Sequence, residues 1–436
     1  MIINKLVVHT FVTAHMARLG SQRFDRRRAT MEKSVPHIVP DYLAHNETSA
    51  AIETGREVVR KQFDDLPYNP TKNIARIKLP TNGVYDYARA YFIFEANCTQ
   101  AGGTYVRFPN GFWNIIHQIR VLDGSEEVFI HRHFNLHQTI QWEIGRQPGV
   151  DTTLGASLYG VANAVTRNGW AATHEYLIPF NIPLLTEKVF DYTMLRHALE
   201  LEITFTQPPE LLESDGVTYT WEITNLNIYV EHLKKMNQKY RQSLRGLGGL
   251  HFIHNHYDTY TTILNSANLN FTIPHVSESI IGMMVIMRDN TTINDPTVND
   301  KFATYYYNNA ETFRIKMNEQ YFPEEPLPLT GQCLAGYMQL LLFLDHWEAS
   351  GEYGDVIPLS SAQWLNNKFI FCYDMEDHPH HPRHYINLRE AHPDSNFTLE
   401  MRFAAPPGVN QRVDIIIISK CVVVYNKRKG CFKSFK

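Results

Sequence analysis

The chain has 436 residues, which is too long for one ordinary small domain and suits two domains of roughly 180 residues. Hydrophobic residues make up 44% of it, enough for full-sized cores, and a net charge of -4 excludes a polycation that binds nucleic acid with its whole surface. The five cysteines are scattered without CxxC spacing, which argues against a zinc ribbon or a disulfide framework and points to a reducing compartment. Because the chain has no apolar run of about 18 residues, no membrane span is predicted.

Residues 1–75 are predicted to form an N-terminal arm that is basic and partly helical. Its helical part is expected at residues 48–63, where apolar side chains recur at helical spacing. The arm also contains a cluster of basic residues. Such a cluster is typical of a segment that binds an anionic partner, but a solvated chain end explains it equally well. The cluster consists of Arg18, Arg23, Arg26, Arg27 and Arg28.

The rest of the chain alternates short apolar runs with turn residues, and these runs are rich in Val, Ile, Phe, Tyr and Thr. This pattern predicts β-strands. In the first half we expect strands at 89–98, 113–124, 126–136, 199–205 and 225–233. After the Gly-rich break at 245–250 we expect them at 268–274, 279–290, 311–318, 368–375, 397–403 and 412–425.

One stretch of the first half matches a stretch of the second half without gaps. Residues 199–210 have the sequence LELEITFTQPPE and residues 397–408 have the sequence FTLEMRFAAPPG. Each copy is followed by a last apolar run, at 224–232 and at 417–427. More loosely, the pair of runs 90–98 and 113–124 parallels the pair 268–276 and 279–290. A repeat this long indicates duplicated domains, because solenoid repeats are far shorter.

We therefore predict an all-β fold of two tandem eight-stranded jelly rolls, a double jelly roll, with long inserted loops and an N-terminal arm. The insertions at 145–176 and 321–365 exceed ordinary loop lengths, so we expect them to be functional or to form interfaces. The expected divisions are the arm 1–75, jelly roll 1 at 76–243, a Gly-rich linker at 244–250, jelly roll 2 at 251–428 and a basic C-terminal tail at 429–436.

With this arrangement the chain resembles the double jelly-roll major capsid proteins of the adenovirus and tectivirus lineage, most closely those of adintoviruses, polinton-like viruses and virophages. The resemblance spans roughly residues 75–428 and is one of pattern and order, without a catalytic motif. The segments that carry it are 111–128, 176–185, 195–205 and 223–231 in the first half, and 368–375, 397–407 and 413–426 in the second.

The resemblance implies a structural protein without enzymatic activity, small-molecule substrate, metal or cofactor. It implies a homotrimer with a pseudo-hexagonal outline that tiles an icosahedral DNA-virus shell with neighbouring capsomers, penton and minor capsid proteins. Assembly would take place inside the host cell, in nucleus or cytoplasm, and the protein would reside in the virion. Inward-facing termini would contact the DNA genome or internal components without reading sequence. Their basic residues are the arginine cluster of the arm and Lys427, Arg428 and Lys429.

A second interpretation comes from bicupins, which are also two jelly-roll barrels but are metal-dependent oxidoreductases. His131 and His133 stand in the spacing of the first cupin motif, and alternation in a strand would place them on one face. His137 occupies the place of the carboxylate of the motif, and no second cupin motif is found. Ordinary polar strand residues explain the two histidines as well. A third interpretation is a β-sandwich protein that binds carbohydrate.

A histidine-rich segment lies at residues 375–385, MEDHPHHPRHY. Its two prolines prevent a helix from presenting two imidazoles to one metal, so we expect a loop between strands. The loop is either a metal site, a hydrated loop or a trimer contact. Since neighbouring imidazoles repel once charged, a trimer contact of this kind predicts acid-sensitive assembly. Its histidines are His378, His380, His381 and His384.

Overall fold

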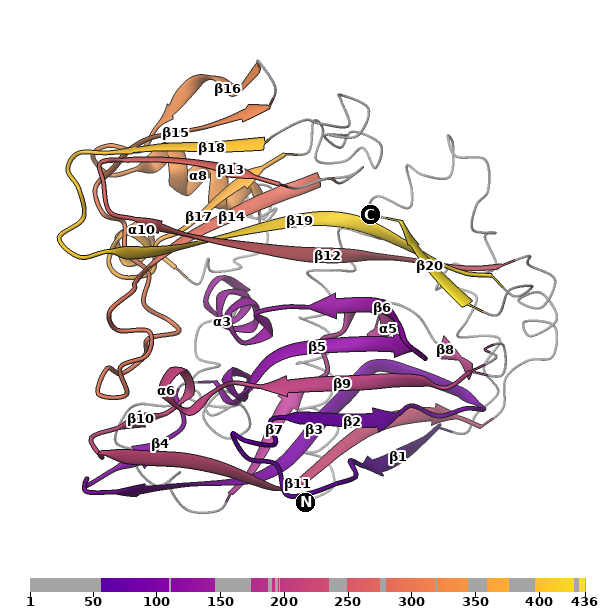
Figure 1. Cartoon of the computed structure of the whole chain (residues 1–436). Coiled ribbons are helices and arrows are strands. Elements are labelled where there is room, and N and C mark those ends of the chain that lie inside the picture. Colours follow the sequence, from indigo (N-terminus) through magenta and orange to yellow (C-terminus); the bar gives the residue numbers. More distant parts are fainter. Residues whose placement is uncertain are drawn as a thin grey trace.

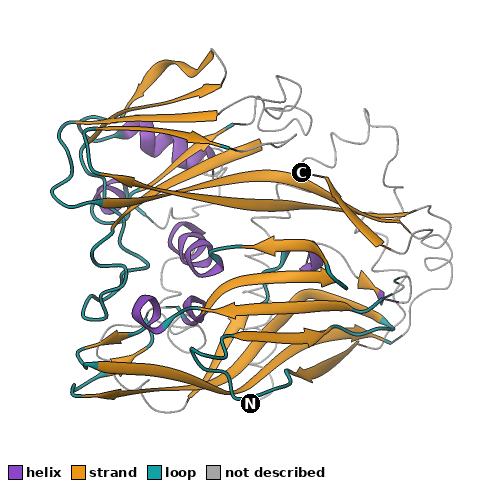
Figure 2. Ribbon diagram, viewed as in Figure 1, coloured by secondary structure: helices purple, strands orange, loops and turns teal. Residues whose placement is uncertain are grey.

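The computed structural model is built almost entirely of antiparallel sheets (Figure 2). It describes residues 56–109, 111–145, 174–186, 190–192, 195, 197–234, 249–274, 280–317, 320–343, 359–375, 397–426 and 431–435. Within these ranges no helix has the length and apolar character needed to span a membrane.

The first half forms two main sheets that face each other. One has the strand order β1-β11-β3-β7, with the short β8 paired to β3, and the other has the order β2-β9-β5-β6. The strands are β1 (Arg56–Gln62), β2 (Ile74–Lys78), β3 (Val84–Ala101), β5 (Ile116–Asp123), β6 (Glu126–His131), β7 (His174–Pro179), β8 (Phe190–Asp191), β9 (Leu199–Phe205) and β11 (Thr218–Leu233). The short strands β4 (Val106–Arg107) and β10 (Glu213–Ser214) pair with each other, and the helices are η2 (Phe112–Ile115), α3 (Phe134–Gly145), α5 (Pro183–Thr186) and α6 (Pro208–Leu211).

The second half repeats this plan. Its sheets have the orders β12-β19-β14-β17, with β20 paired to β19, and β13-β18-β15-β16. The strands are β12 (Gly249–Leu264), β13 (Asn268–Ile273), β14 (Ile280–Asp289), β15 (Ala310–Met317), β16 (Gln320–Pro328), β17 (Ile370–Asp374), β18 (Phe397–Phe403), β19 (Gln411–Asn426) and β20 (Cys431–Phe435). The helices are α8 (Leu334–Phe343) and α10 (Ser361–Leu365).

The two halves therefore have the same strand order. Among the eight main strands of each half, the first, eighth, third and sixth form one sheet, and the second, seventh, fourth and fifth form the other. This is the connectivity of a jelly roll, so the predicted double jelly roll is confirmed. The sequence match of 199–210 with 397–408 is structurally meaningful, because β9 and β18 are the seventh strand of their half and each lies between the second and fourth strands.

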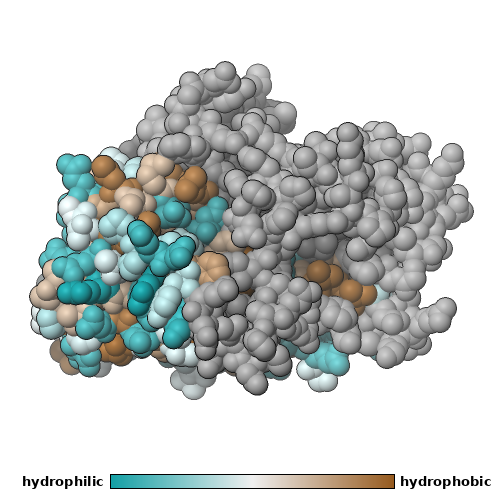
Figure 3. Space-filling model, turned by 90° about the horizontal axis from the view of Figure 1, so that it is seen from above, coloured by the Kyte–Doolittle hydropathy of each residue, from teal (hydrophilic) through white to brown (hydrophobic). Residues whose placement is uncertain are grey.

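Alternating side chains build the core of each half. Along β18 the residues Phe397, Leu399, Met401 and Phe403 are buried while the residues between them are not. Successive side chains of a strand point to opposite faces, so this alternation gives β18 one buried apolar side and one more exposed side. β14 differs, because all of its residues except Asp289 are buried. Seen from above, the described part of the surface is mostly hydrophilic with small separate hydrophobic patches (Figure 3).

The halves lie one above the other in the view of Figure 1, and α3 of the first half lies between them. Leu136, Ile140 and Ile144 of this helix belong to the hydrophobic core of the second half. In the other direction, Phe252 and Val423 of the second half join the core of the first. The two jelly rolls are thus joined by shared apolar packing.

Several sequence-based boundaries are wrong. The helix expected at 48–63 is a strand over its described part, because β1 pairs along its whole length with β11 and completes the first jelly roll. The arm therefore does not extend to residue 75. Backbone pairing with a neighbouring strand outweighs local helical spacing here, as tertiary context often does.

The expected boundaries of the linker and of the C-terminal tail are also wrong, again because residues there pair with a distant strand. Gly249, which was expected in the linker, already pairs with Asn426, and the expected tail contains β20, which pairs with β19.

The looser of the two sequence matches pairs strands that are not equivalent. Residues 90–98 and 113–124 contribute to the third and fourth strands of the first half, whereas 268–276 and 279–290 contain the second and third strands of the second half. The insertion at 321–365 contains most of β16 together with α8 and α10, while the residues of the other insertion from 146 to 173 lie outside the described ranges.

Candidate functional site

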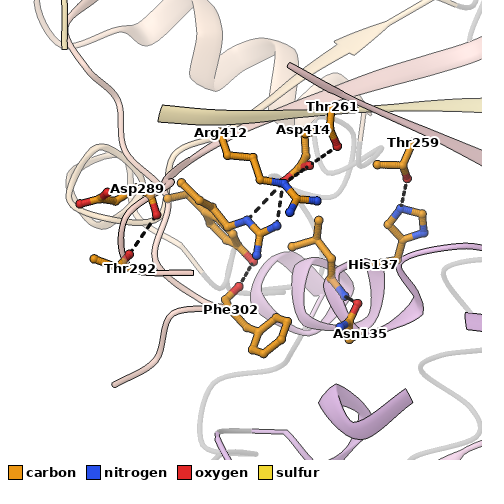
Figure 4. Close-up of polar contacts among 12 residues, drawn as sticks. Asn135, His137, Thr259, Thr261, Asp289, Thr292, Phe302, Arg412 and Asp414 are labelled. Carbon is orange, nitrogen blue, oxygen red and sulfur yellow. Dashed lines mark hydrogen bonds and ion pairs between the residues drawn. The ribbon is translucent and has the colours of Figure 1, made fainter. Parts of the chain in front are cut away.

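The contact between the two jelly rolls contains a short chain of polar side chains, which we call the histidine contact: the buried His131 and His137 and the partly buried Tyr257 and Thr259. Nε2 of His131 at the end of β6 lies 2.6 Å from Nδ1 of His137 on α3. Nε2 of His137 lies 3.0 Å from Oγ1 of Thr259 on β12 (Figure 4). The ring of Tyr257 stacks on His131, with centroids 5.1 Å apart and an interplanar angle of 12°. The contact therefore joins two elements of the first half to one strand of the second.

The histidines of this contact are held neutral. Burial, followed by the nearby His256 and His133, lowers the pKa of His131 to about 3. Burial and then His131 place the pKa of His137 well below its ordinary value. A buried imidazole loses its hydration when charged, so the neutral form is favoured.

His131 and His133 do not lie on one face of a strand, so the alternation expected for them is wrong. β6 ends at His131, and His133 lies in the following turn with a left-handed φ of 52°. Its ring packs against His117 instead, with centroids 5.1 Å apart, while the ring of His131 turns toward α3. Within the described ranges no group of three or more His, Cys, Asp or Glu side chains is arranged to hold a metal ion. The geometry thus does not support the cupin interpretation.

A buried ion cluster of the second half lies beside α3 of the first half (Figure 4). Asp414 on β19 accepts hydrogen bonds from Arg288 Nη2 at 2.8 Å, Arg412 Nε at 2.9 Å and Thr261 Oγ1 at 2.7 Å. Burial alone would raise the pKa of Asp414, but the charges of Arg288 and Arg412 outweigh it and hold the pKa at about 2. Because the carboxylate is fully buried and paired, it is an anchor for the strands β12, β14 and β19.

A second contact between the halves is made by residues 290–303, which follow β14 and reach the first half; we call it the loop clasp. Glu213 on β10 accepts hydrogen bonds from Arg107 Nε at 2.8 Å and from the backbone N–H of Asp300 at 2.9 Å. Arg107 also donates to Oδ1 of Asn299 at 2.9 Å. Both members of the Arg107–Glu213 pair belong to the first half and are buried, so the loop clasp makes its hydrogen bonds to a desolvated ion pair.

Lys301 completes the loop clasp. Its Nζ donates to the carbonyl oxygens of Pro209 at 2.7 Å and Leu212 at 3.3 Å in the first half, and to that of Asp295 at 3.3 Å. Burial lowers the pKa of Lys301 to about 8, although the nearby Glu213 opposes this shift. The histidine contact and the loop clasp together hold the two jelly rolls in one arrangement.

The other predicted site residues lie outside the described ranges. These are the arginine cluster of the arm, the basic residues after β19 and the histidine-rich loop: Arg18, Arg23, Arg26, Arg27, Arg28, Lys427, Arg428, Lys429, His378, His380, His381 and His384. Their proposed roles stay predictions.

Sequence reasoning missed the buried ion cluster of the second half and the loop clasp. Asp414 offered a signal, because it is a lone acid at the start of the apolar run 413–418. An acid in a buried strand requires a partner, and that requirement points to arginines on neighbouring strands. Glu213 and Lys301 offered no such signal, since neither stands within an apolar run of the sequence.

The solved structures with similar folds are virus capsid components. PBCV-1 VP54, fitted into a reconstruction of the virophage Sputnik, aligns with a TM-score of 0.58 at 10% identity, over 88% of this chain and 97% of that one. The PBCV-1 virus capsid aligns with a TM-score of 0.58 at 10% identity, over 85% of this chain and 95% of that one. The Faustovirus major capsid protein aligns with a TM-score of 0.55 at 9% identity, over 94% and 99% of the two chains.

The likeness lies in three-dimensional structure and not in sequence. No family model matches this chain, and no curated protein matches it in sequence. Because the sequence identity is only 9–10%, the likeness establishes the fold alone, which is the double jelly roll of these major capsid proteins.

Proposed function

We propose that this chain is the major capsid protein of a DNA virus and acts by self-association. The observation that supports this most strongly is a pair of jelly rolls with identical strand order, held together by the histidine contact and the loop clasp. Two similar barrels in a fixed arrangement can act as a repeating unit of a shell. The match to the Faustovirus major capsid protein extends over 94% of the chain.

The proposed mechanism is geometric. Each subunit contributes two lobes of similar shape, so a three-fold trimer has six lobes and an almost six-fold outline. Such units can tile a closed icosahedral shell together with copies of themselves and with penton and minor capsid proteins. The shared packing between the halves keeps the lobes at a constant spacing, which tiling requires.

The basic chain ends fit the inside of such a shell. Arg18 to Arg28 and Lys427 to Lys429 would neutralise phosphates of the DNA genome, or contact other internal components, without reading sequence. The protein would then be found in the virion after assembly in the nucleus or cytoplasm of the host cell. We propose no catalytic role, because the fold matches are capsid components and the cupin geometry of His131 and His133 is not formed.

The test is the mass and outline of the purified full chain. Mass photometry should give a particle of about 150 kDa, three chains of 50.5 kDa, and negative-stain class averages should show a hexagonal outline. Metal analysis of the same sample distinguishes the capsid protein from the enzymatic alternative, which requires a stoichiometric transition metal. Monomers or dimers without the hexagonal outline would refute the capsomer proposal.

A further inference from the structure

The histidine contact has no carboxylate bonded to either imidazole in the described part of the chain. Its members are linked to each other and to a threonine, through the pairs His131–His137 and His137–Thr259. Two polarities of the neutral chain fit these distances. In the first, His131 Nε2–H donates to His137 and His137 Nε2–H donates to Thr259, and in the second, Thr259 Oγ1–H donates to His137 and His137 Nδ1–H donates to His131. Nδ1 of His131 is a buried acceptor in the first polarity and a buried N–H in the second, and in both it has no hydrogen-bond partner among the described residues.

The surroundings offer little compensation for a positive charge. The charges that act on His131 and His137 come from other histidines. The nearest acid on β12, Asp258, is paired with His256 at 3.2 Å, and Glu143 on α3 is paired with Lys368 at 2.9 Å. The titratable and charged groups around the histidine contact include His117, Arg132, His133, Glu143, His254, His256, Asp258, Arg288, Lys368, Arg412, Asp414 and Lys420. On β6 itself, Glu126 and Glu127 are exposed, and Glu127 is paired with Arg120.

We propose that the histidine contact makes the junction of the two jelly rolls acid-sensitive, so that α3 and the end of β6 part from β12 when the imidazoles take up protons. Once each imidazole has taken up a proton, Nε2 of His131 and Nδ1 of His137 both carry a hydrogen, so the hydrogen bond between them is lost whichever polarity the neutral chain had. Two charged imidazoles 2.6 Å apart would then repel each other. When α3 and the end of β6 separate from β12, the imidazole rings of His131 and His137 become accessible to water.

The opening would be one-sided. Asp414, with a pKa of about 2, stays charged through mild acid, and so does Lys301, with a pKa of about 8. The ion cluster beside α3 and the lysine of the loop clasp therefore keep their charges when the histidines change theirs. The two jelly rolls would pivot about the loop clasp while the α3 side opens. This inference rests on the fold and not on the capsid role.

The size of the effect follows from proton linkage. A histidine that is neutral in the closed contact and titrates normally in the open one raises the opening constant about tenfold per pH unit below about 6.5. For His131 and His137 together, the expected rise from about pH 7.5 to about pH 5.5 is roughly 100-fold.

Hydrogen exchange of the full chain tests this directly, after correction for the intrinsic pH dependence of amide exchange. Amides of α3 and of β12 near Thr259 should lose roughly 100-fold in protection over that pH range, while β9 and β18 keep theirs. Unchanged protection in α3 would overturn the proposal. A uniform loss over all strands would also overturn it, because that result means global unfolding.

Two variants sharpen the test. In the double variant His131→Phe with His137→Gln, the phenyl ring keeps the stacking on Tyr257 and the amide keeps a donor for Thr259, so α3 should stay protected in acid. His197→Gln, at an exposed histidine, should behave like the wild type. Acid-induced exchange that persists in the double variant contradicts the proposal. If that variant does not fold, the wild-type pH series decides the question alone.

Discussion

Arg120 on β5 and Glu202 on β9 lie directly opposite each other and form an ion pair, with Nη1 and Oε1 2.7 Å apart. Arg314 and Glu400 repeat this pair at the corresponding place of the second half, with Nε and Oε2 2.6 Å apart. The sequence match of 199–210 with 397–408 aligns the two glutamates. The duplication is thus visible in a specific interaction as well as in strand order.

The two copies of this pair should differ in their contribution to stability. Glu202 is only 3% exposed and also contacts Arg76, whereas Glu400 is 23% exposed. We expect Glu202→Gln to lower the free energy of unfolding by about 1–3 kcal/mol and Glu400→Gln by less than about 1 kcal/mol. Urea denaturation of both variants measures the difference, and equal losses would contradict this account.

The Asp414 cluster predicts a larger effect. Asp414→Asn removes the charge that compensates Arg288, whose side chain is buried, so we expect a loss of about 3–5 kcal/mol in the free energy of unfolding. Glu311→Gln is a matched control, because Glu311 pairs with the exposed Arg402 and its loss should cost less than about 1 kcal/mol. Calorimetry of the two variants under identical conditions compares them, and a similar decrease in Tm would argue against a buried anchor.

Lowering the pH should reduce the free energy of unfolding in two ranges, which overlap between about pH 4 and about pH 3. The folded state holds the pKa of His131 at about 3 and that of His133 at about 4, both below the ordinary value for histidine. The unfolded chain therefore binds more protons below about pH 6.5, so the stability from these groups is complete above that pH and declines by up to about 1.4 kcal/mol per pH unit for each. Asp414, with a pKa of about 2, contributes stability that is lost only below about pH 4.

Urea unfolding at a series of pH values measures this dependence. The free energy of unfolding should decrease from about pH 6.5 downward, before any change due to Asp414 begins. The variant His131→Phe should show a shallower slope from about pH 6.5 down to about pH 3, and it should keep the further loss that is due to Asp414. An unchanged slope would mean that His131 does not titrate as its burial requires.

Gly282 on β14 predicts a steric effect. A Cβ at this position would lie 2.5 Å from Cε2 of Phe343 on α8 and 3.3 Å from the carbonyl oxygen of Tyr373. Gly282→Ala should push α8 away from the sheet and cost about 1–3 kcal/mol. Gly408→Ala is the control, since a Cβ there meets nothing within 4 Å. Comparison of the two Tm values tests this, and a control as damaging as Gly282→Ala would refute the steric explanation.

Sequence alone was sufficient for the fold class and for the duplication. The alternation of Leu399, Met401 and Phe403 is a local property of a strand with one buried face, and the same alternation in 199–205 reveals the repeat. Side-chain period and repeated order do not depend on distant contacts, so they can be read from the chain.

Tertiary structure decided the features that depend on partners far away in the chain. Residues 56–62 form a strand because β11 supplies their hydrogen-bond partners, although their spacing suggested a helix. His131 and His133 point apart because β6 ends between them. His137 meets Thr259 only when α3 packs against the second half, across 122 positions of the chain. Local pattern sets which residues are buried, but long-range packing alone selects which buried groups meet.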